Sequence, residues 1–126
     1  MKGHLMPIKK VNLADKLSQF DELWSPRIVG EVNNFAVKIA KLEGEFVWHH
    51  HEEEDELFMV LAGQLDIRLK DGDVILDPGE MVIIPHGVEH MPVAETETHI
   101  LMFERKGTLN TGNVDDEHTR RDLEII

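Results

Sequence analysis

The hydrophobic pattern of the chain changes at Arg27, after which short apolar or alternating segments are separated at close intervals by turn residues. Asn33-Asn34 and Asp71-Gly72 tolerate the positive φ angles that tight hairpins require. Pro78-Gly79 and Pro85-His86-Gly87 interrupt the later segments in the same way. This pattern is typical of an antiparallel all-β sandwich or barrel. The predicted strands are Arg27 to Val32, Phe35 to Leu42, Glu45 to His51, Glu56 to Ala62, Gln64 to Lys70, Asp73 to Leu76, Met81 to Ile84, Glu89 to Val93 and His99 to Glu104.

One short helix is expected before the strands. Asn12 is a residue type that caps helix N-termini, and Leu13, Leu17 and Phe20 follow it at roughly helical spacing. The helix is expected to end near Pro26, because proline cannot continue a helix from its interior.

The two ends of the chain lie outside the strand pattern. After Lys106 the sequence is mostly polar, and we expect a tail with one or two helical turns near Glu117 to Glu124. Met6-Pro7 reads as an alternative start, so residues 1–5 are interpreted as a leader or cloning remnant, and His4 is left out of the functional argument. The expected division is an N-terminal segment with a short helix over residues 1–26, a barrel over 27–106 and a C-terminal tail over 107–126.

Composition narrows the class of protein. A chain of 126 residues, 41% apolar and 30% charged, is long enough for one globular domain. Its net charge of -12 repels phosphates and anionic lipids, so we expect neither nucleic acid nor a membrane surface as a partner. No apolar run approaches the roughly 20 residues that span a bilayer, and no signal-like segment precedes the helix. A soluble cytoplasmic protein is expected.

The absence of cysteine makes the histidines the candidate metal ligands, together with Asp and Glu. The stretch from Trp48 to Glu56 reads WHHHEEEDE, which is either a solvated charge run or a set of ligands. Successive side chains of a strand alternate faces, so His49 and His51 share one side while His50 points to the other beside Trp48. Two imidazoles on one face lie close enough to bind a single ion.

The acid that joins these histidines depends on where the strand ends. If the strand continues beyond His51, parity selects Glu53 or Asp55. If residues 52–55 instead form an exposed hairpin tip, Glu56 at the start of the next strand returns beside the histidines. We favour the second alternative, in which Glu56 is the inward carboxylate.

A further ligand is predicted downstream. Residues 79–90 read GEMVIIPHGVEH, an apolar strand followed by a Pro-x-Gly corner and then by His90 at the start of a returning strand. His86 lies in the corner and is expected to be exposed, His99 can face either way, and His118 is interpreted as a surface residue. The predicted metal ligands are His49, His51, Glu56 and His90.

Two spaced motifs contain these candidate ligands. The first is G-x4-H-x-H-x4-E-x6-G, formed by Gly44, His49, His51, Glu56 and Gly63. The second is G-x5-P-x-G-x2-H, formed by Gly79, Pro85, Gly87 and His90. With these motifs, residues 27–106 resemble the cupin superfamily, and most of all its small single-domain members described as mannose-6-phosphate-isomerase-like.

The match to that superfamily has two departures. The first motif usually has five residues between its glycine and its first histidine, where this chain has four. The asparagine often found four residues after the second-motif histidine is Ala94 here. Neither departure removes a metal ligand, but the missing asparagine leaves the hydrogen-bonding support of the ligands open.

The resemblance implies an all-β double-stranded β-helix, or jelly-roll, cupin barrel. It also implies a homodimer, since similar cupins pair through an apolar outer face. The alternative cover for that face is the N-terminal segment, through Leu17, Phe20 and Trp24, and we favour a dimer with an N-terminal contribution. By parity, the residues of this outer face are Phe46, Trp48, Leu57, Met59 and Leu61.

Three imidazoles and one carboxylate suit a divalent transition metal, namely Zn, Fe, Mn, Ni or Co. Four protein ligands on an octahedral ion leave two positions open for chemistry. The first hypothesis is therefore a metal-dependent small-molecule enzyme of isomerase or dioxygenase type. The alternative is a non-catalytic module that binds or senses a sugar-like ligand or metabolite. A cavity lined by apolar side chains outside the metal ligands would favour the binding module, whereas convergent polar groups would favour catalysis.

Sugar-phosphate chemistry would require a cation at the site to clamp the phosphate. Four acids, residues 52–55, ring the expected mouth and repel anions. Only Lys38 and Lys41 are candidate inward cations on the early strands. The isomerase branch is therefore permitted by the sequence but has no specific support.

Overall fold

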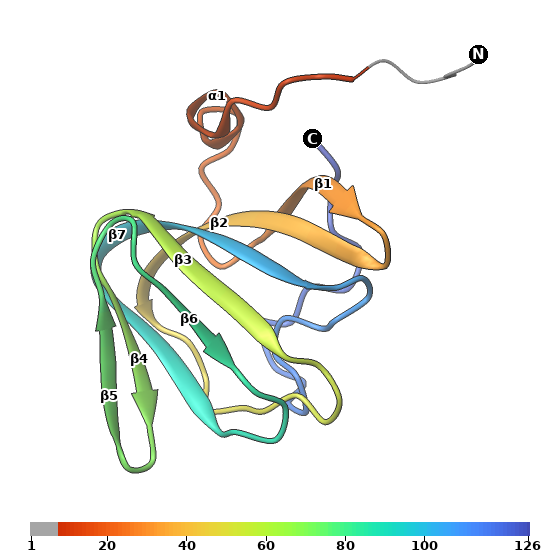
Figure 1. The fold of residues 1–126 in the computed structure, drawn as a ribbon. Helices are drawn as coiled ribbons and strands as arrows, with labels where there is room; N and C mark the ends of the chain where they lie inside the picture. Colours follow the sequence, from red (N-terminus) through yellow and green to blue (C-terminus); the bar gives the residue numbers. More distant parts are fainter. Residues whose placement is uncertain (1–7) are drawn as a thin grey trace.

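The computed structural model describes residues 8–126, so His4 and the predicted leader over residues 1–5 lie outside the described residues. One short helix, α1, precedes seven strands, all paired antiparallel (Figure 1). The elements are α1 (Leu13–Leu17), β1 (Arg27–Val32), β2 (Phe35–Glu45), β3 (Glu56–Ala62), β4 (Leu65–Leu69), β5 (Gly72–Leu76), β6 (Met81–Ile84) and β7 (His90–Arg105).

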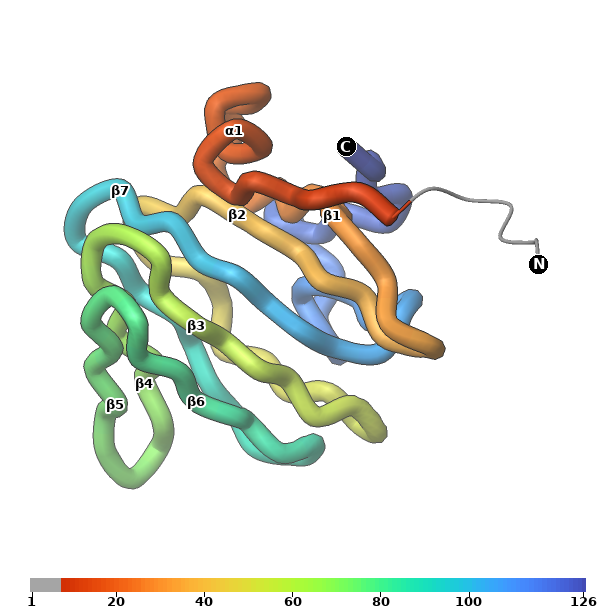
Figure 2. Tube along the Cα trace, turned by 45° about the horizontal axis from the view of Figure 1, so that its top comes forward, coloured from red at the N-terminus to blue at the C-terminus, as the bar shows by residue number. Residues whose placement is uncertain are grey.

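The long strand β7 joins the two layers of the barrel. Its first residues, His90 to Val93, pair with β4, whereas its later part pairs with β2 on one side and β3 on the other. The resulting order is β1-β2-β7-β3-β6, with the β4-β5 hairpin attached through β7 (Figure 2). The predicted all-β jelly-roll barrel is therefore confirmed, although the two strands predicted over Glu89 to Val93 and His99 to Glu104 are one continuous strand.

The strand predictions are confirmed in most of the barrel and wrong in one segment. β1, β3 and β6 have the predicted bounds, and β2 continues three residues beyond Leu42. The predicted strand from Glu45 to His51 does not form, because after Glu45 only His49 pairs with another strand, in an isolated bridge to His90. The backbone amide of Phe46 donates to Pro92, so this segment crosses the barrel end with single contacts instead of a ladder.

The barrel interior is filled by alternating residues of facing strands. On β2, for example, Ala40 and Leu42 are buried in the same cluster as Phe58 of β3, Ile67 of β4 and Ile100 of β7. Burying a side chain of Leu or Phe size contributes about 1.5–3 kcal/mol. This apolar cluster surrounds the polar side chains that form the candidate site.

The N-terminal segment covers the outer face of β2, as α1 lying over this part of the sheet illustrates (Figure 2). The predicted cap is confirmed, since the Asn12 side chain accepts a hydrogen bond of 3.0 Å from the amide of Asp15. The helix is shorter than predicted and ends at Leu17, yet Leu17 and Phe20 both pack against Ile39. Within residues 8–126, no helix has the length and apolar character required to span a membrane.

The C-terminal segment forms no helix over Glu117 to Glu124, in contrast to the prediction. It is instead bonded to the barrel as an irregular chain with several turns. Ile28 of β1 donates to the carbonyl of Glu124 and accepts from the amide of Ile126, at 2.9 and 3.0 Å. Earlier in the same segment, the amide of Asn113 donates to the carbonyl of His50 at 3.0 Å. These long-range backbone bonds with β1 and with His50 take the place of the local backbone bonds of the expected helix.

Gly63, between β3 and β4, gives a direct test of this packing. Its φ is +90°, and a Cβ atom there would lie 2.5 Å from the Thr98 hydroxyl oxygen and 2.9 Å from the Thr98 Cα. Gly79 has a similar φ of +86° but open space around it. Gly79→Ala is expected to lower the free energy of unfolding by about 1–2 kcal/mol through backbone strain, and Gly63→Ala by about 1–3 kcal/mol more through overlap. Urea denaturation measures both, and equal losses would contradict the packing argument.

Candidate functional site

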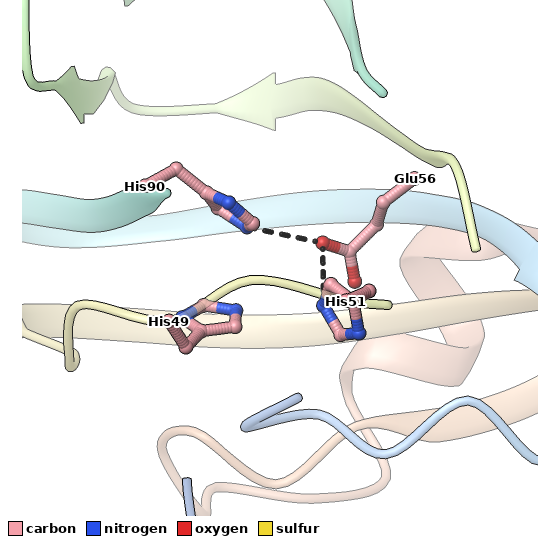
Figure 3. Close-up of side chains that lie close together, drawn as sticks. All are labelled: His49, His51, Glu56 and His90. Atoms are coloured by element: carbon pink, nitrogen blue, oxygen red, sulfur yellow. Dashed lines mark ion pairs between the residues drawn. The ribbon is translucent and has the colours of Figure 1, made fainter. Parts of the chain in front are cut away.

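Four polar side chains from three segments meet inside the barrel (Figure 3). His49 and His51 come from the segment between β2 and β3, Glu56 is the first residue of β3, and His90 is the first residue of β7. One ligand atom of each lies within 4.8 Å of the others, and no side chain is more than 4% exposed. The structure thus brings together all four residues predicted from the sequence.

Backbone hydrogen bonds hold the two histidine-bearing segments together. The amide of His49 donates to the carbonyl of His90 at 3.0 Å, and the amide of His90 donates back at 2.9 Å. The two imidazole centroids are 4.2 Å apart as a result. The amide of Gly87 donates to the carbonyl of His51 at 2.7 Å, so the Pro-x-Gly corner also positions the second histidine.

The imidazole orientations leave lone pairs directed into the cluster. Nδ1 of His49 lies 2.9 Å from the Val47 carbonyl, and Nδ1 of His90 lies 2.9 Å from the Val88 carbonyl. A carbonyl only accepts hydrogen bonds, so each Nδ1 carries a proton, and in the neutral ring Nε2 presents its lone pair to the cluster. This tautomer is the one that a metal-binding imidazole uses when its other nitrogen is fixed by the protein.

The donor atoms fit a transition-metal ion. Oε1 of Glu56 is 3.3 Å from Nε2 of both His51 and His90, and none of these three buried atoms has an aligned hydrogen-bond partner (Figure 3). Buried polar atoms are normally paired, so three unpaired donor atoms that converge fit a set of metal ligands. Donors about 2.0–2.2 Å from a shared ion lie about 3 Å apart. The observed spacing is close to this value.

The protonation states also suit metal binding. Burial, aided by the neighbouring His90, lowers the pKa of His49 to about 4, so this imidazole is neutral near pH 7. Burial by itself would raise the pKa of Glu56, but Glu104 and the imidazoles of His51 and His90 favour the charged form and hold it well below its usual value. The site therefore offers a neutral imidazole at His49 and an ionised carboxylate at Glu56.

Glu104 and Lys38 form a buried polar line behind Glu56. Glu104 lies directly opposite Glu56 in the pairing of β3 with β7 and is 1% exposed. Burial and the charge of Glu56 raise the pKa of Glu104 well above its usual value. Nζ of Lys38 lies 2.5 Å from Oε2 of Glu104 and 3.4 Å from the carbonyl of Thr108. Glu104 was not predicted from the sequence, although its strand parity with Ile100 and Met102 already pointed inward.

The remaining histidines of the described chain lie outside the cluster. His50 points away as predicted, pairing with Glu52 at 2.6 Å and with Glu89. His86 is exposed, as predicted, and pairs with Asp55 at 2.9 Å. Neither Asp55 nor Glu53, the alternative acids, belongs to the cluster. His99 is held by Glu97 at 2.8 Å, and His118 is partly buried with its ring against Phe46 instead of lying free on the surface.

A small cavity of about 30 Å³ lies beside His49. Phe46 lines it with its ring edge-on to His49 at 5.4 Å, in contrast to the prediction that it faces away from the ligands. Parity fails here because residues 46–48 are not in a regular strand. The floor of the cavity consists of Ala40, Leu42, Phe58, Pro92, Ile100 and Met102.

Fold and site together define a jelly-roll barrel with an internal His/Glu cluster that is able to hold a metal ion. The family described as cupin domain matches residues 35–104. The uncharacterised protein YdbB of Bacillus subtilis is 35% identical over 99 residues, covering 78% of this chain and 88% of that protein. The chain therefore belongs to the cupin family.

Two solved structures support the same relationship. The crystal structure of a cupin-2 domain containing protein from Shewanella frigidimarina is 46% identical, with a TM-score of 0.75, and the match covers 76% of this chain and 94% of that one. The crystal structure of a protein from Neisseria meningitidis is 27% identical, with a TM-score of 0.71, and the match covers 78% and 100% of the two chains.

Lys38 is expected to support the candidate ligand Glu56 through Glu104. Lys38→Met removes the cation that contacts Glu104, and we expect metal affinity to fall about 10–100-fold, as for other residues that orient a ligand. Lys41→Met is the matched control, because Lys41 is also a buried lysine of β2 but its Nζ bonds the carbonyl of Phe20 at 2.6 Å. Competition titration with Zn²⁺ measures the affinities, and the Co²⁺ absorption spectrum reports the coordination. Equal effects of the two variants would refute this role.

Proposed function

We propose that His49, His51, Glu56 and His90 hold a divalent transition-metal ion and that the protein is a metal-dependent small-molecule enzyme of dioxygenase type. The observation that carries the proposal is the convergence of unpaired, buried donor atoms beside an apolar cavity. Zn, Fe, Mn, Ni and Co all suit this donor set, and dioxygenase chemistry favours Fe.

The residues of the chain would have separate roles in this chemistry. The three imidazoles and one carboxylate fix the ion, and four protein ligands leave positions open on an octahedral metal. When bound, the metal supplies Lewis-acid character and access to dioxygen chemistry. The surrounding apolar side chains exclude water from the substrate. A dioxygenase places both oxygen atoms in its substrate, so no separate reductant is needed.

The isomerase branch of the first hypothesis has less support. Moving a proton along a sugar requires acid-base groups next to the substrate. His49 is the single titratable residue that lines the cavity. Lys38 and Lys41, the candidate phosphate clamps, are both buried and engaged by Glu104 and by the Phe20 carbonyl.

A non-catalytic binding or sensing module is the second candidate. The largely apolar lining of the cavity is the observation that favours it. The two functions differ in whether a bound ligand reacts with dioxygen. Dioxygen uptake by the Fe(II)-loaded protein in a screen of phenols, in excess of uptake by His51→Ala, supports the enzyme. Ligand binding without uptake supports the module.

Metal binding itself is tested on protein purified without a metal-affinity column. Elemental analysis is expected to find about one transition-metal ion per chain. His51→Ala is expected to lose it, because one of the four donors is removed, whereas His50→Ala is expected to keep it, since His50 bonds Glu52 and Glu89 outside the cluster. Equal metal content in the two variants, or none in the parent after incubation with Zn²⁺ or Fe²⁺, would overturn the proposal.

We also propose that the protein is a homodimer in the cytoplasm and that the dimer forms through the outer face of β3, β6 and β7. Leu57 lies opposite Ile83 on one side and Phe103 on the other, so apolar side chains continue across three strands. Met81 and Ile83 are 54% and 53% exposed. Of this face, Leu61 packs in the apolar cluster with Leu13, Leu17 and Phe20 of the described N-terminal residues. Met81 and Ile83 lie outside that cluster, so the exposed patch fits a second copy.

Ile83→Lys tests this interface. A charge at the centre of an apolar contact is costly to bury, so the variant is expected to shift to monomer in light scattering. Ile75→Lys is the control. Ile75 is 48% exposed but lies on β5, in the β4-β5 hairpin outside the proposed interface. A monomeric parent protein, or a dimer that survives Ile83→Lys, would contradict the proposed interface.

A further inference from the structure

The cavity beside His49 has an apolar floor and an aromatic rim. The floor residues Ala40 and Ile100 are at most 1% exposed, and His49 is the polar group at the cavity wall that belongs to the metal cluster. At the rim, the rings of Trp24 and Phe46 stack at 4.8 Å with an interplanar angle of 16°. The rim therefore joins a segment before β1 to the segment after β2 over one apolar space.

The other polar residue of the lining has little hydrogen-bonding capacity left. The Asn110 side chain donates to the carbonyl of His118 at 2.8 Å and accepts from the amide of Arg120 at 2.9 Å. A bound molecule would therefore find apolar surface on most sides. Its main polar anchor would be the ion held next to His49.

The cavity lining offers no charged side chain to an anionic ligand. None of its eleven lining residues is Lys, Arg, Asp or Glu. The three buried cations of the described chain are already engaged: Lys38 by Glu104, Lys41 by the Phe20 carbonyl, and Arg27 by Ser25 and Glu22. A phosphate buried here would have the ion at His49 as its counter-charge, and the part of its charge that does not face this ion would carry a large desolvation penalty.

The second approach to the cluster is acidic. A surface cleft of about 280 Å³ reaches His51 and is bordered by Glu52 and Glu54 together with Asn113 of the C-terminal segment. The net charge of -12 adds to this local field. Divalent cations are attracted along such a route, and anions are repelled from it.

We infer that the ligand of this site is a small uncharged molecule with an apolar, ring-sized body and one oxygen directed at the metal. The inference rests on the proposed metal site and names the class of molecule that this site takes. The apolar body would occupy the cavity between the floor residues and the Trp24–Phe46 pair, and the oxygen would lie near His49. A sugar phosphate, with about two negative charges, is disfavoured because the lining offers it no lysine or arginine beside the metal ion.

The rim must move when a ring enters. A cavity of about 30 Å³ holds about one or two water-sized groups. Trp24 and Phe46 are partly exposed and lie outside the strands. An outward turn of their side chains would therefore break no hydrogen bond of the strand ladders. Trp24 has a φ of +57°, which is strained for a bulky residue, and its indole nitrogen donates to the Glu43 carbonyl at 2.9 Å. Release of this contact would change tryptophan fluorescence on binding.

The test uses Zn²⁺-loaded protein with phenol and glucose 6-phosphate as probes. Calorimetry and tryptophan fluorescence measure the binding of each probe. Phenol is expected to bind at least tenfold more tightly than glucose 6-phosphate. Ala40→Leu fills the cavity floor and is expected to weaken phenol binding at least tenfold. Ala94 is an equally buried alanine of the same core that lies outside the cavity lining. Ala94→Leu is expected to change the phenol affinity less than twofold. Met102→Ala enlarges the cavity and is expected to strengthen phenol binding.

The outcomes separate this inference from the proposed metal function. Glucose 6-phosphate binding as tightly as phenol, or phenol affinity unchanged in both Ala40→Leu and Met102→Ala, would overturn the inference even if the protein holds a metal ion. If Ala40→Leu fails to fold, the Met102→Ala comparison still decides. Elemental analysis of the same samples stands apart. Phenol binding in protein that takes up no metal would overturn the metal proposal and leave the apolar pocket in place.

Discussion

The reciprocal backbone hydrogen bonds between His49 and His90 are the contact on which the rest of the site depends. They join the irregular segment after β2 to the first residue of β7, two parts of the chain that are some forty residues apart. Because the bonds run in both directions, they fix the register of the two residues and face their imidazoles toward each other. Glu56 meets them since β3 starts beside this closed end of the barrel.

The polar cluster survives in an apolar barrel because its members compensate one another. An isolated buried carboxylate would take up a proton, but Glu56 is surrounded by imidazoles and stays ionised. Behind it, Glu104 and Lys38 continue the line of polar groups from β7 to β2. The Nδ1 atoms of His49 and His90 are satisfied by carbonyls of their own segments. The unpaired atoms of His51, Glu56 and His90 lie close together, as ligands of one metal ion do.

The engagement of the buried cations has consequences for ligand choice. Lys38 faces the interior but belongs to the polar line behind Glu56, while Lys41 faces the opposite side of β2 beneath the N-terminal segment. Neither is free to recognise a phosphate. Together with the apolar floor around Ile100, this leaves the proposed metal ion as the positive charge that the cavity could offer an anion. The same fold serves many reactions, so these local contacts carry more information than the fold itself.

The sequence by itself determined the features that depend on local periodicity and spacing. These include the bounds of β1, β3 and β6 and the choice of Glu56 over the acids of the hairpin tip. The parity argument for His49 and His51 gave the observed side although the strand that it assumed does not form. Only the tertiary structure decided that Glu104 stands opposite Glu56, that Phe46 turns toward the cavity, and that the C-terminal segment is bonded to β1 instead of forming a helix. Each of these depends on pairings between residues far apart in the chain, and local side-chain periodicity carries no information about such pairings.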